Sequence, residues 1–285
     1  MGILNVTPDS FSDGGRHFDP ETAVQAAIAM VSDGATIIDV GGESTRPGAT
    51  RVTVSEEQRR VLPVIEALAG HPALGGARIS VDTRNEETAM RALAAGAAML
   101  NDVSASLHEV AAGAGAAWVA MHMAGEPATM QAAPHYEDVV DEVRSFLAER
   151  ARLALRGGVS EVWVDPGIGF GKTTAHNVAL LAGIDRLVAD GHPVLVGVSA
   201  KRSMGVLTAR SDDACSPYPP RTPGGLVGSG AEFDSVEPTV TGDRLQGSLA
   251  AASWAIIHGA RGVRVHDIRA TVSAVTALAG EPASG

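Results

Sequence analysis

The sequence has 285 residues and only one cysteine, Cys215. One cysteine excludes an internal disulfide bond and a cysteine-based zinc site. It also fits a reducing compartment, so a cytoplasmic location is expected. Cys215 lies in a stretch rich in Pro, Ser and Gly, which does not favour a catalytic nucleophile.

Long apolar runs and basic clusters are missing as well. No stretch approaches the roughly 20 apolar residues that cross a bilayer, and the N-terminus lacks the basic and apolar segments of a signal peptide. The formal net charge is -11, and the Lys and Arg residues form no run or stripe. We therefore expect small-molecule partners, no nucleic acid and no membrane.

What the sequence does contain is a series of short apolar runs, each of which stops on a polar residue. These runs end, in chain order, at Asn5, Asp39, Asp82, Asn101, His122, Asp165, Ser199 and His266. Helix-like segments lie between them, at 20–31, 56–69, 86–95, 135–155, 177–189, 245–258 and 268–278. Alternating strands and helices predict an α/β fold, and eight such units predict a TIM (β/α)8 barrel that forms one domain over 1–285. No G-x-G-x-x-G follows an early strand, which argues against an open dinucleotide-binding sheet.

One segment interrupts the alternation. Residues 208–243 are rich in Pro, Gly, Ser and Asp and have little periodicity. We interpret them as a long insertion between strands 7 and 8. A variable surface loop is the favoured interpretation, and a lid or partner site is the alternative. At the other end, the first strand begins almost at Met1, which leaves open an absent N-terminal segment.

Acidic and amide side chains stand at three of the strand ends. Asp82 and Asp165 close apolar runs, so their carboxylates should be half-buried and must be paired or hydrogen-bonded. Two carboxylates in one pocket suit a planar heterocycle with several N–H donors on one edge, and Asn101 adds a donor and an acceptor. For each acid alone, capping of the next helix is the alternative. Asp39, which precedes Gly41 and Gly42, favours that alternative.

Basic side chains follow the last two strands, at Lys201, Arg202, Arg264 and His266. These strand ends often hold a phosphate group in TIM barrels. Arg264 and His266 alternate with valines, so both should point the same way and could form an anion site. A solitary Arg–His pair on the rim is the alternative.

Two polar loops follow the first two strands, at 5–15 and 41–48. Both are rich in Gly, Ser, Asp and Pro, and each carries a bulky or charged residue, Phe11 or Arg46. Such loops on a catalytic rim often close over a ligand. Ordinary solvated loops would have a similar composition.

A series of motifs in these segments resembles a known enzyme family. In order, they are Asn-Val-Thr-Pro-Asp-Ser-Phe-Ser-Asp-Gly-Gly, Asp-Val-Gly-Gly-Glu-Ser-Thr-Arg-Pro-Gly, Ser-Val-Asp-Thr, Asn-Asp-Val-Ser, Met-His, Asp-Pro-Gly-Ile-Gly-Phe-Gly-Lys-Thr, Ser-Ala-Lys-Arg and Arg-Val-His-Asp, from residue 5 to 267. This series is similar to dihydropteroate synthase of folate biosynthesis. The resemblance implies a TIM barrel that joins 4-aminobenzoate to 6-hydroxymethyl-7,8-dihydropterin diphosphate and releases diphosphate.

The resemblance also implies roles for individual residues. It implies a pterin site made by Asp82, Asn101, Asp165 and Lys201, with Val103, Met121 and Phe170 packed near it. It implies that Asn5, Arg264 and His266 take the diphosphate, with Mg2+ at Asn5, and that the loops carrying Phe11, Asp13, Thr45, Arg46 and Pro47 shape the aminobenzoate site. Family members usually dimerise through helices late in the barrel, so a homodimer is expected.

The chemistry of such a reaction needs no covalent enzyme intermediate. Diphosphate leaves readily once Arg264, His266 and a metal neutralise its charge. The carbon left behind is cationic and conjugated with the pterin, and Asp13 on the closed loop is placed to stabilise it. Lys201 completes the catalytic set. We therefore expect a dissociative substitution.

The chain departs from the family pattern after strand 7. The family usually has Ser-Arg-Lys there, and this chain has Ser199-Ala200-Lys201-Arg202. Arg202 is a candidate partner of the aminobenzoate carboxylate beside Ser199. Two alternatives to an active synthase stay open at this point: a catalytically weak or inactive pterin-binding paralogue, and a folate-using methyltransferase barrel.

Overall fold

The computed structural model describes residues 1–7, 19–43, 51–125, 129–131, 134–198 and 245–279. The strands are β1 (Gly2–Asn5), β2 (Ile37–Gly41), β3 (Arg78–Asp82), β4 (Met99–Asp102), β5 (Ala117–Met121), β6 (Val162–Asp165), β7 (Leu195–Gly197) and β8 (Gly262–Arg264). β1 to β6 form one parallel sheet in chain order, and β7 pairs with β8 in parallel. The predicted strands are therefore all present.

Two bridges close these strands into a barrel. Val164 in β6 bridges to Val194, just before β7, and Gly2 in β1 bridges to Val265, just after β8. Backbone hydrogen bonds support both seams, with 3.0 Å from Val164 N to Pro193 O and 3.0 Å from Ile3 N to Val265 O. The strands thus form a continuous ring, and the predicted TIM barrel is confirmed.

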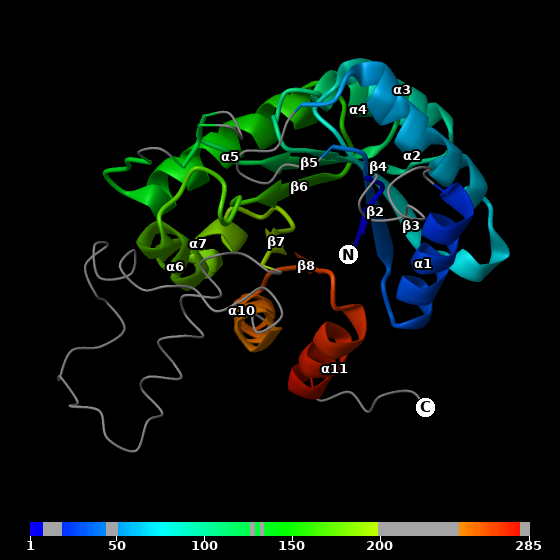
Figure 1. Ribbon diagram of the computed structural model, residues 1–285. Helices are drawn as coiled ribbons and strands as arrows, with labels where there is room; N and C mark the ends of the chain where they lie inside the picture. The colour runs from blue at the N-terminus through cyan, green and yellow to red at the C-terminus, as the bar shows by residue number, and fades with distance from the viewer. Residues whose placement is uncertain (8–18, 44–50, 126–128, 132–133, 199–244, 280–285) are drawn as a thin grey trace.

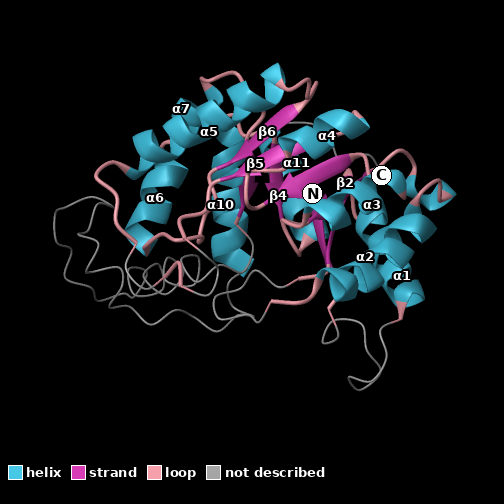
Figure 2. Cartoon of the chain, turned by 90° about the horizontal axis from the view of Figure 1, so that it is seen from above, coloured by secondary structure: helices cyan, strands magenta, loops and turns pink. Residues whose placement is uncertain are grey.

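The helices are α1 (Pro20–Ser32), α2 (Val54–Leu68), α3 (Glu86–Ala94), α4 (His108–Ala114), α5 (Val139–Arg156), α6 (Thr174–Ala182), α7 (Ile184–Val188), α10 (Leu245–Ile257) and α11 (Ile268–Ala279), with a short 3-10 helix at Pro72–Leu74. They lie outside the strands (Figures 1 and 2). Asp19 caps α1 by accepting from the backbone N–H groups of Glu21 and Thr22, as its Asp-Pro-Glu sequence predicts. No helix among the described residues is long and apolar enough to cross a membrane.

The sequence reading was wrong about two helices. α4 was not predicted, because it has seven residues and is too short to show a clear period. The single helix expected over 177–189 is two helices, α6 and α7, which meet at Gly183. The predicted insertion 208–243 lies outside the described residues.

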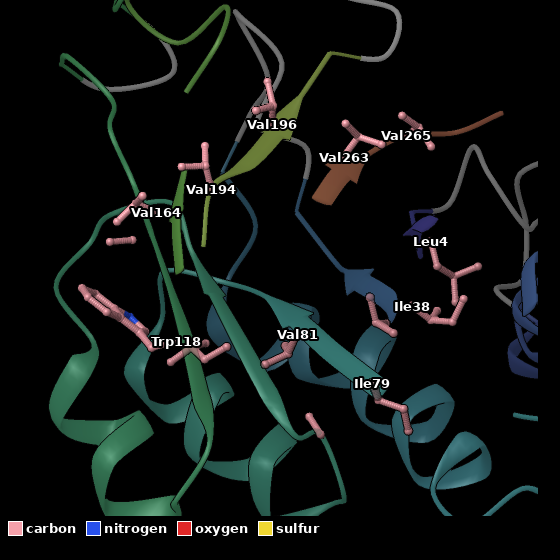
Figure 3. Close-up of a cluster of buried hydrophobic side chains, with 14 of the residues drawn as sticks. Leu4, Ile38, Ile79, Val81, Trp118, Val164, Val194, Val196, Val263 and Val265 are labelled. Atoms are coloured by element: carbon pink, nitrogen blue, oxygen red, sulfur yellow. The ribbon is translucent and has the colours of Figure 1, made fainter. Parts of the chain in front are cut away.

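The strands bury apolar side chains on both faces, as barrel strands must. Leu4, Ile38, Val81, Trp118 and Val164 point out of the ring and pack against the helices in the main core, part of which is drawn in Figure 3. Each large side chain of this kind stabilises the fold by about 1.5–3 kcal/mol. A smaller apolar layer fills the inside of the barrel, made by Ile37, Met99, Ala117, Val119, Trp163 and Leu195.

Inward-pointing residues recur every second position along a strand, so the residues next to this inner apolar layer can be read from the sequence. In β2, β4 and β6 the next inward position after Ile37, Met99 or Trp163 is polar, and these positions are occupied by Asp39, Asn101 and Asp165. The lower half of the barrel interior is therefore a packed core. The upper half, at the carboxyl ends of the strands, is polar.

Candidate active site

A cleft opens at the carboxyl ends of β3 to β8. Its lining residues are Asp82, Asn101, Val103, Met121, Asp165, Gly167, Ile168, Phe170, Gly197 and Arg264. Seven of these were predicted as site residues from the sequence, and the structure brings them together.

Arg264 is the centre of an ion-pair network at the edge of this cleft. Its Nε donates to Asp39 Oδ2 at 2.6 Å, and its Nη2 donates to Asp82 Oδ2 at 2.6 Å. Burial alone lowers the pKa of the Arg264 guanidinium, but the charges of Asp39 and Asp82 outweigh burial and raise that pKa above its ordinary value. The guanidinium is therefore permanently charged and is held between two carboxylates.

Asp39 occupies a different place from the one predicted. It was expected to cap the following helix, but the N-cap of α2 is Thr53. Asp39 is instead fully buried inside the barrel, where its Oδ2 accepts from Arg264 and also from Asn101 Nδ2 at 2.9 Å. The capping prediction was wrong because the inward period of β2 turns this carboxylate toward strands β4 and β8, away from its own helix.

Asp165 is held by the turn that follows it. Its Oδ1 accepts from Gly167 N at 2.7 Å, and the side chain is almost completely buried. Gly167 has a φ of +65°, and a Cβ there would lie 1.9 Å from His122 O. Only glycine can therefore occupy this position, which explains the first glycine of the Asp-Pro-Gly-Ile-Gly-Phe-Gly-Lys segment.

The last residue of that segment, Lys172, was not predicted as a site residue. Its side chain is 3% exposed, and its Nζ donates to the carbonyl oxygens of Gly167 at 3.1 Å, Phe170 at 3.0 Å and His122 at 3.3 Å. Nζ also lies 2.9 Å from His122 Nδ1. Lys172 thus ties loop 166–171 to the end of β5, and both Gly167 and Phe170 of that loop line the cleft.

His122, which the sequence left without a role, is the partner of Lys172. Burial first, and then the charge of Lys172, lower the pKa of His122 to about 3. The ring is therefore neutral at physiological pH, and Nδ1 accepts a hydrogen bond from the lysine. Phe146 packs edge-on against the same ring, with 5.0 Å between the centroids.

An apolar wall covers the other side of the cleft. Val103, Met121 and Phe170 cluster with Met130, and Met123 packs against them. The family resemblance implies that Val103, Met121 and Phe170 pack near the pterin, and in the structure these side chains contact one another. A planar ring could lie on this wall with its edge toward the carboxylates.

The stem of the second loop is fixed by two arginines that the sequence reading missed. Arg84, two residues after β3, pairs with Glu43 at 2.6 Å, and both side chains are nearly buried. Arg60 of α2 donates to Gly42 O at 2.8 Å. Both contacts hold the chain at the point where segment 44–50 begins.

Two predicted residues lie at the rim outside the cleft lining. Asn5 is the last residue of β1, and His266 is exposed two residues beyond Arg264. Val263 and Val265 are buried, so the predicted alternation with Arg264 and His266 is present. Among the described residues no group of three His, Cys, Asp or Glu side chains could hold a metal ion.

The remaining predicted site residues lie outside the described part of the chain. They are Phe11, Asp13, Thr45, Arg46, Pro47, Ser199, Lys201 and Arg202.

The chain is similar to proteins of known function. A family model described as "Pterin binding enzyme" matches residues 1–266. The dihydropteroate synthase of Mycobacterium leprae is 43% identical over 285 residues, which covers 96% of this chain and 90% of that protein. A structure of Xanthomonas albilineans dihydropteroate synthase with 4-aminobenzoic acid has a TM-score of 0.81 and 44% identity, covering 99% of this chain and 93% of that one. The Thermus thermophilus dihydropteroate synthase in complex with 6HMPPP has a TM-score of 0.74 and 40% identity, covering 98% and 92%.

Proposed function

The chain belongs to the dihydropteroate synthase family, and we propose that the cleft at the ends of β3 to β8 is its pterin site. The enzyme joins 4-aminobenzoate to 6-hydroxymethyl-7,8-dihydropterin diphosphate, giving 7,8-dihydropteroate and diphosphate. The observation that carries the proposed site is the convergence of Asp82, Asn101, Asp165 and Arg264 on one cleft.

The donor and acceptor pattern of the cleft suits the pterin ring. The carboxylates of Asp82 and Asp165 accept hydrogen bonds only, so they complement the amino and ring N–H groups along one edge of a dihydropterin. Val103, Met121 and Phe170 supply the flat apolar wall on which the ring lies. In this proposal Lys201 also holds the pterin.

The bond that breaks joins the pterin methylene carbon to the diphosphate oxygen. In a dissociative substitution the leaving diphosphate takes the bonding electron pair, and Arg264 and His266 neutralise its growing charge. The methylene carbon becomes cationic, with Asp13 as the stabilising carboxylate. The weakly basic aniline nitrogen then attacks this carbon and loses one proton to solvent.

Mg2+ is proposed as the cofactor, with Asn5 as its protein ligand. Mg2+ prefers oxygen ligands and is commonly held by one or two protein groups together with substrate phosphates. The Asn5 amide oxygen at the end of β1 fits such a site. The ion supplies charge neutralisation for the departing diphosphate.

The aminobenzoate site is proposed to form from the two loops that carry Phe11, Thr45, Arg46 and Pro47, together with Ser199 and Arg202. Arg60 and Arg84 fix Gly42 and Glu43 at the stem of the second loop. Because Ala200 stands where the family usually has arginine, Arg202 is proposed to pair with the substrate carboxylate.

One assay tests the proposed function directly. The purified protein is incubated with the dihydropterin diphosphate, 4-aminobenzoate and Mg2+, and released diphosphate and dihydropteroate are measured. Diphosphate release that needs both substrates supports the proposal. Pterin binding without turnover would identify an inactive paralogue instead.

The role of Asp13 has its own test. Asp13→Ala should lose most of kcat, because the developing cation loses its carboxylate, while the affinity for the pterin changes little. Unchanged turnover in this variant would exclude Asp13 from catalysis.

A homodimer and a cytoplasmic location complete the proposal. Trp254 and Ile257 are 46% and 61% exposed on α10, and their spacing of three puts them on one face. Light scattering should give twice the chain mass, and Ile257→Lys should shift it to one chain mass. The single cysteine supports the reducing compartment.

A further inference from the structure

Asp39 is buried beside the cleft but does not line it. The side chain is 0% exposed, and Asp39 is absent from the lining residues. Any effect of this carboxylate on a ligand must therefore pass through its neighbours. Two of those neighbours, Asn101 and Arg264, line the cleft and donate hydrogen bonds to Asp39.

A single oxygen atom of Asp39 binds both neighbours. Oδ2 accepts from Asn101 Nδ2 at 2.9 Å and from Arg264 Nε at 2.6 Å. The other oxygen, Oδ1, has no hydrogen-bond partner among the described residues. A buried charge is costly unless it is paired, so the free energy of this carboxylate depends on Asn101 and Arg264 keeping their places.

The contact decides which way the Asn101 amide faces. A carboxylate can only accept, so Asn101 must present its NH2 group to Asp39, and its Oδ1 is turned away. If Asp39 could donate, the amide could reverse and exchange its acceptor for a donor. The orientation of Asn101 in the cleft is therefore set by the chemical identity of residue 39.

The same contact limits the movement of Arg264. Its Nε faces Asp39 and its Nη2 faces Asp82 at 2.6 Å, so the guanidinium is fixed along two sides. Without Asp39 the guanidinium would lose the contact on its Nε side and, among the described residues, would be held by Asp82 on its Nη2 side. Gly41, the next inward position of β2, leaves space for Asp82, because a Cβ there would already lie 3.4 Å from Asp82 Cβ.

From these contacts we propose that Asp39 is a positioning residue, which through one buried oxygen orients both the amide that contacts the pterin and the guanidinium that contacts the diphosphate. The proposal rests on the proposed function of the cleft. It makes recognition of the ring and handling of the leaving group depend on one residue outside the cleft.

A double-mutant cycle tests the first half of the proposal. The probe is 6-hydroxymethyl-7,8-dihydropterin without diphosphate, and its Kd is measured by calorimetry for wild type, Asp39→Asn, Asn101→Ala and the double variant. Asp39→Asn should weaken binding by about tenfold, as expected for one lost or reversed hydrogen bond. In the Asn101→Ala background the same substitution should have almost no effect, because the amide through which it acts is gone. Losses that multiply would indicate general damage and overturn the assignment.

Turnover tests the second half. Asp39→Asn should lower kcat at least about tenfold at saturating substrates, because a loosely held guanidinium stabilises the leaving group poorly. An unchanged or raised kcat would mean that the charge of Asp39 does not help Arg264, and would refute this half.

A matched control separates positioning from stability. Glu57 is an equally buried carboxylate, 1% exposed, which accepts from Thr83, Asn85 and Thr88 on the outside of the barrel. Glu57→Gln should lower Tm but leave the pterin Kd and kcat within about twofold, since none of its contacts reaches the cleft lining. If Asp39→Asn does not fold, Asp39→Ser replaces it in the double-mutant cycle with Asn101→Ala.

The outcomes also distinguish the two proposals. Wild-type protein that neither binds the pterin probe nor turns over would refute the function proposed for the cleft. Wild-type protein that does both, with Asp39→Asn unaffected, would refute the role of Asp39 alone.

Discussion

The two halves of the cleft are held in place by different forces. On the side of β2, β3, β4 and β8, charged groups hold one another, with Arg264 between Asp39 and Asp82. On the side of β5 and β6, Lys172 donates to backbone carbonyls and to a neutral histidine, and apolar side chains form the wall. The first half should respond strongly to changes of charge. The second should respond to changes of shape and loop position.

Arg264→Met should produce the largest effect, because it removes a cation that pairs with two carboxylates. We expect kcat to fall by about a hundredfold or more. The free energy of unfolding should fall by about 3–5 kcal/mol, because the fully buried carboxylate of Asp39 would lose its ion-pair partner. Steady-state kinetics and urea unfolding measure the two effects.

The matched control is Arg269→Met, which removes an arginine from a surface pair. Arg269 is 83% exposed and contacts Asp33 at 2.6 Å. Its loss should cost no more than about 1 kcal/mol. If both variants lost the same free energy of unfolding, the buried ion-pair network would stabilise the fold no more than the surface pair does.

Lys172→Met should produce the next largest effect and should act through loop position. The variant removes the lysine hydrogen bond from three carbonyl oxygens, so we expect a loss of about 2–4 kcal/mol in stability. The KM for the pterin substrate should rise about tenfold, because Gly167 and Phe170 lose their anchor. The kcat should change less than in Arg264→Met.

Tyr136→Phe is the comparison for this variant. The Tyr136 hydroxyl donates to Gly171 O at 2.8 Å, so it holds the same loop by one neutral hydrogen bond. Its removal should cost about 1 kcal/mol. If Tyr136→Phe raises KM as much as Lys172→Met does, the lysine is not the main anchor of the loop.

The pH dependence of stability tests the half of the cleft at β5 and β6, through the titration of His122. The pKa of His122 is about 3 in the folded protein, lowered by burial and then by Lys172, whereas an unfolded histidine titrates near about 6.5. Between these values the unfolded state binds more protons, so stability should fall as pH is lowered from about 6.5 toward 3, by up to about 1.4 kcal/mol per pH unit from this group. His122→Gln should show a shallower fall in urea unfolding over that range. Parallel curves would show that His122 does not titrate as proposed.

Met121→Leu should produce the smallest effect. The two side chains have similar volumes, so stability should change by less than about 1.5 kcal/mol and the KM for the pterin by about threefold at most. A large rise in KM would mean that pterin binding is as sensitive to small changes in the apolar wall as to changes in the charged half. The KM of the purified variant decides this.

The family resemblance alone supplied Val103, Met121 and Phe170 of the cleft. The strands and the barrel could be predicted from the sequence itself, because each apolar run ends where its strand ends. Asp82, Asn101 and Asp165 were predicted for this reason. Asp39 was not, because its role depends on Arg264, which lies 225 positions away along the chain. A local pattern gives the face of a strand but does not identify the partner across a barrel.

Lys172 escaped prediction for a related reason. The lysine ends a glycine-rich segment, and its burial depends on backbone turns that only the fold defines. Gly167 has φ +65° and Gly171 has φ +63°, and a Cβ on Gly171 would lie 2.4 Å from Ala124 O. The glycines were a visible signal of close backbone approach, and the carbonyl oxygens that they expose are what the lysine binds.

The burial of Lys172 has a practical consequence for proteolysis. The chain has two lysines, Lys172 and Lys201, so a lysine-specific protease has two cleavage sites. A protease needs an extended, accessible strand of backbone, and the peptide after Lys172 becomes accessible only when its ammonium leaves its carbonyl partners. The rate at which a fragment ending at residue 172 appears therefore measures how often loop 166–171 opens. Because Phe170 lines the cleft, a ligand bound at the proposed pterin site should slow this cleavage.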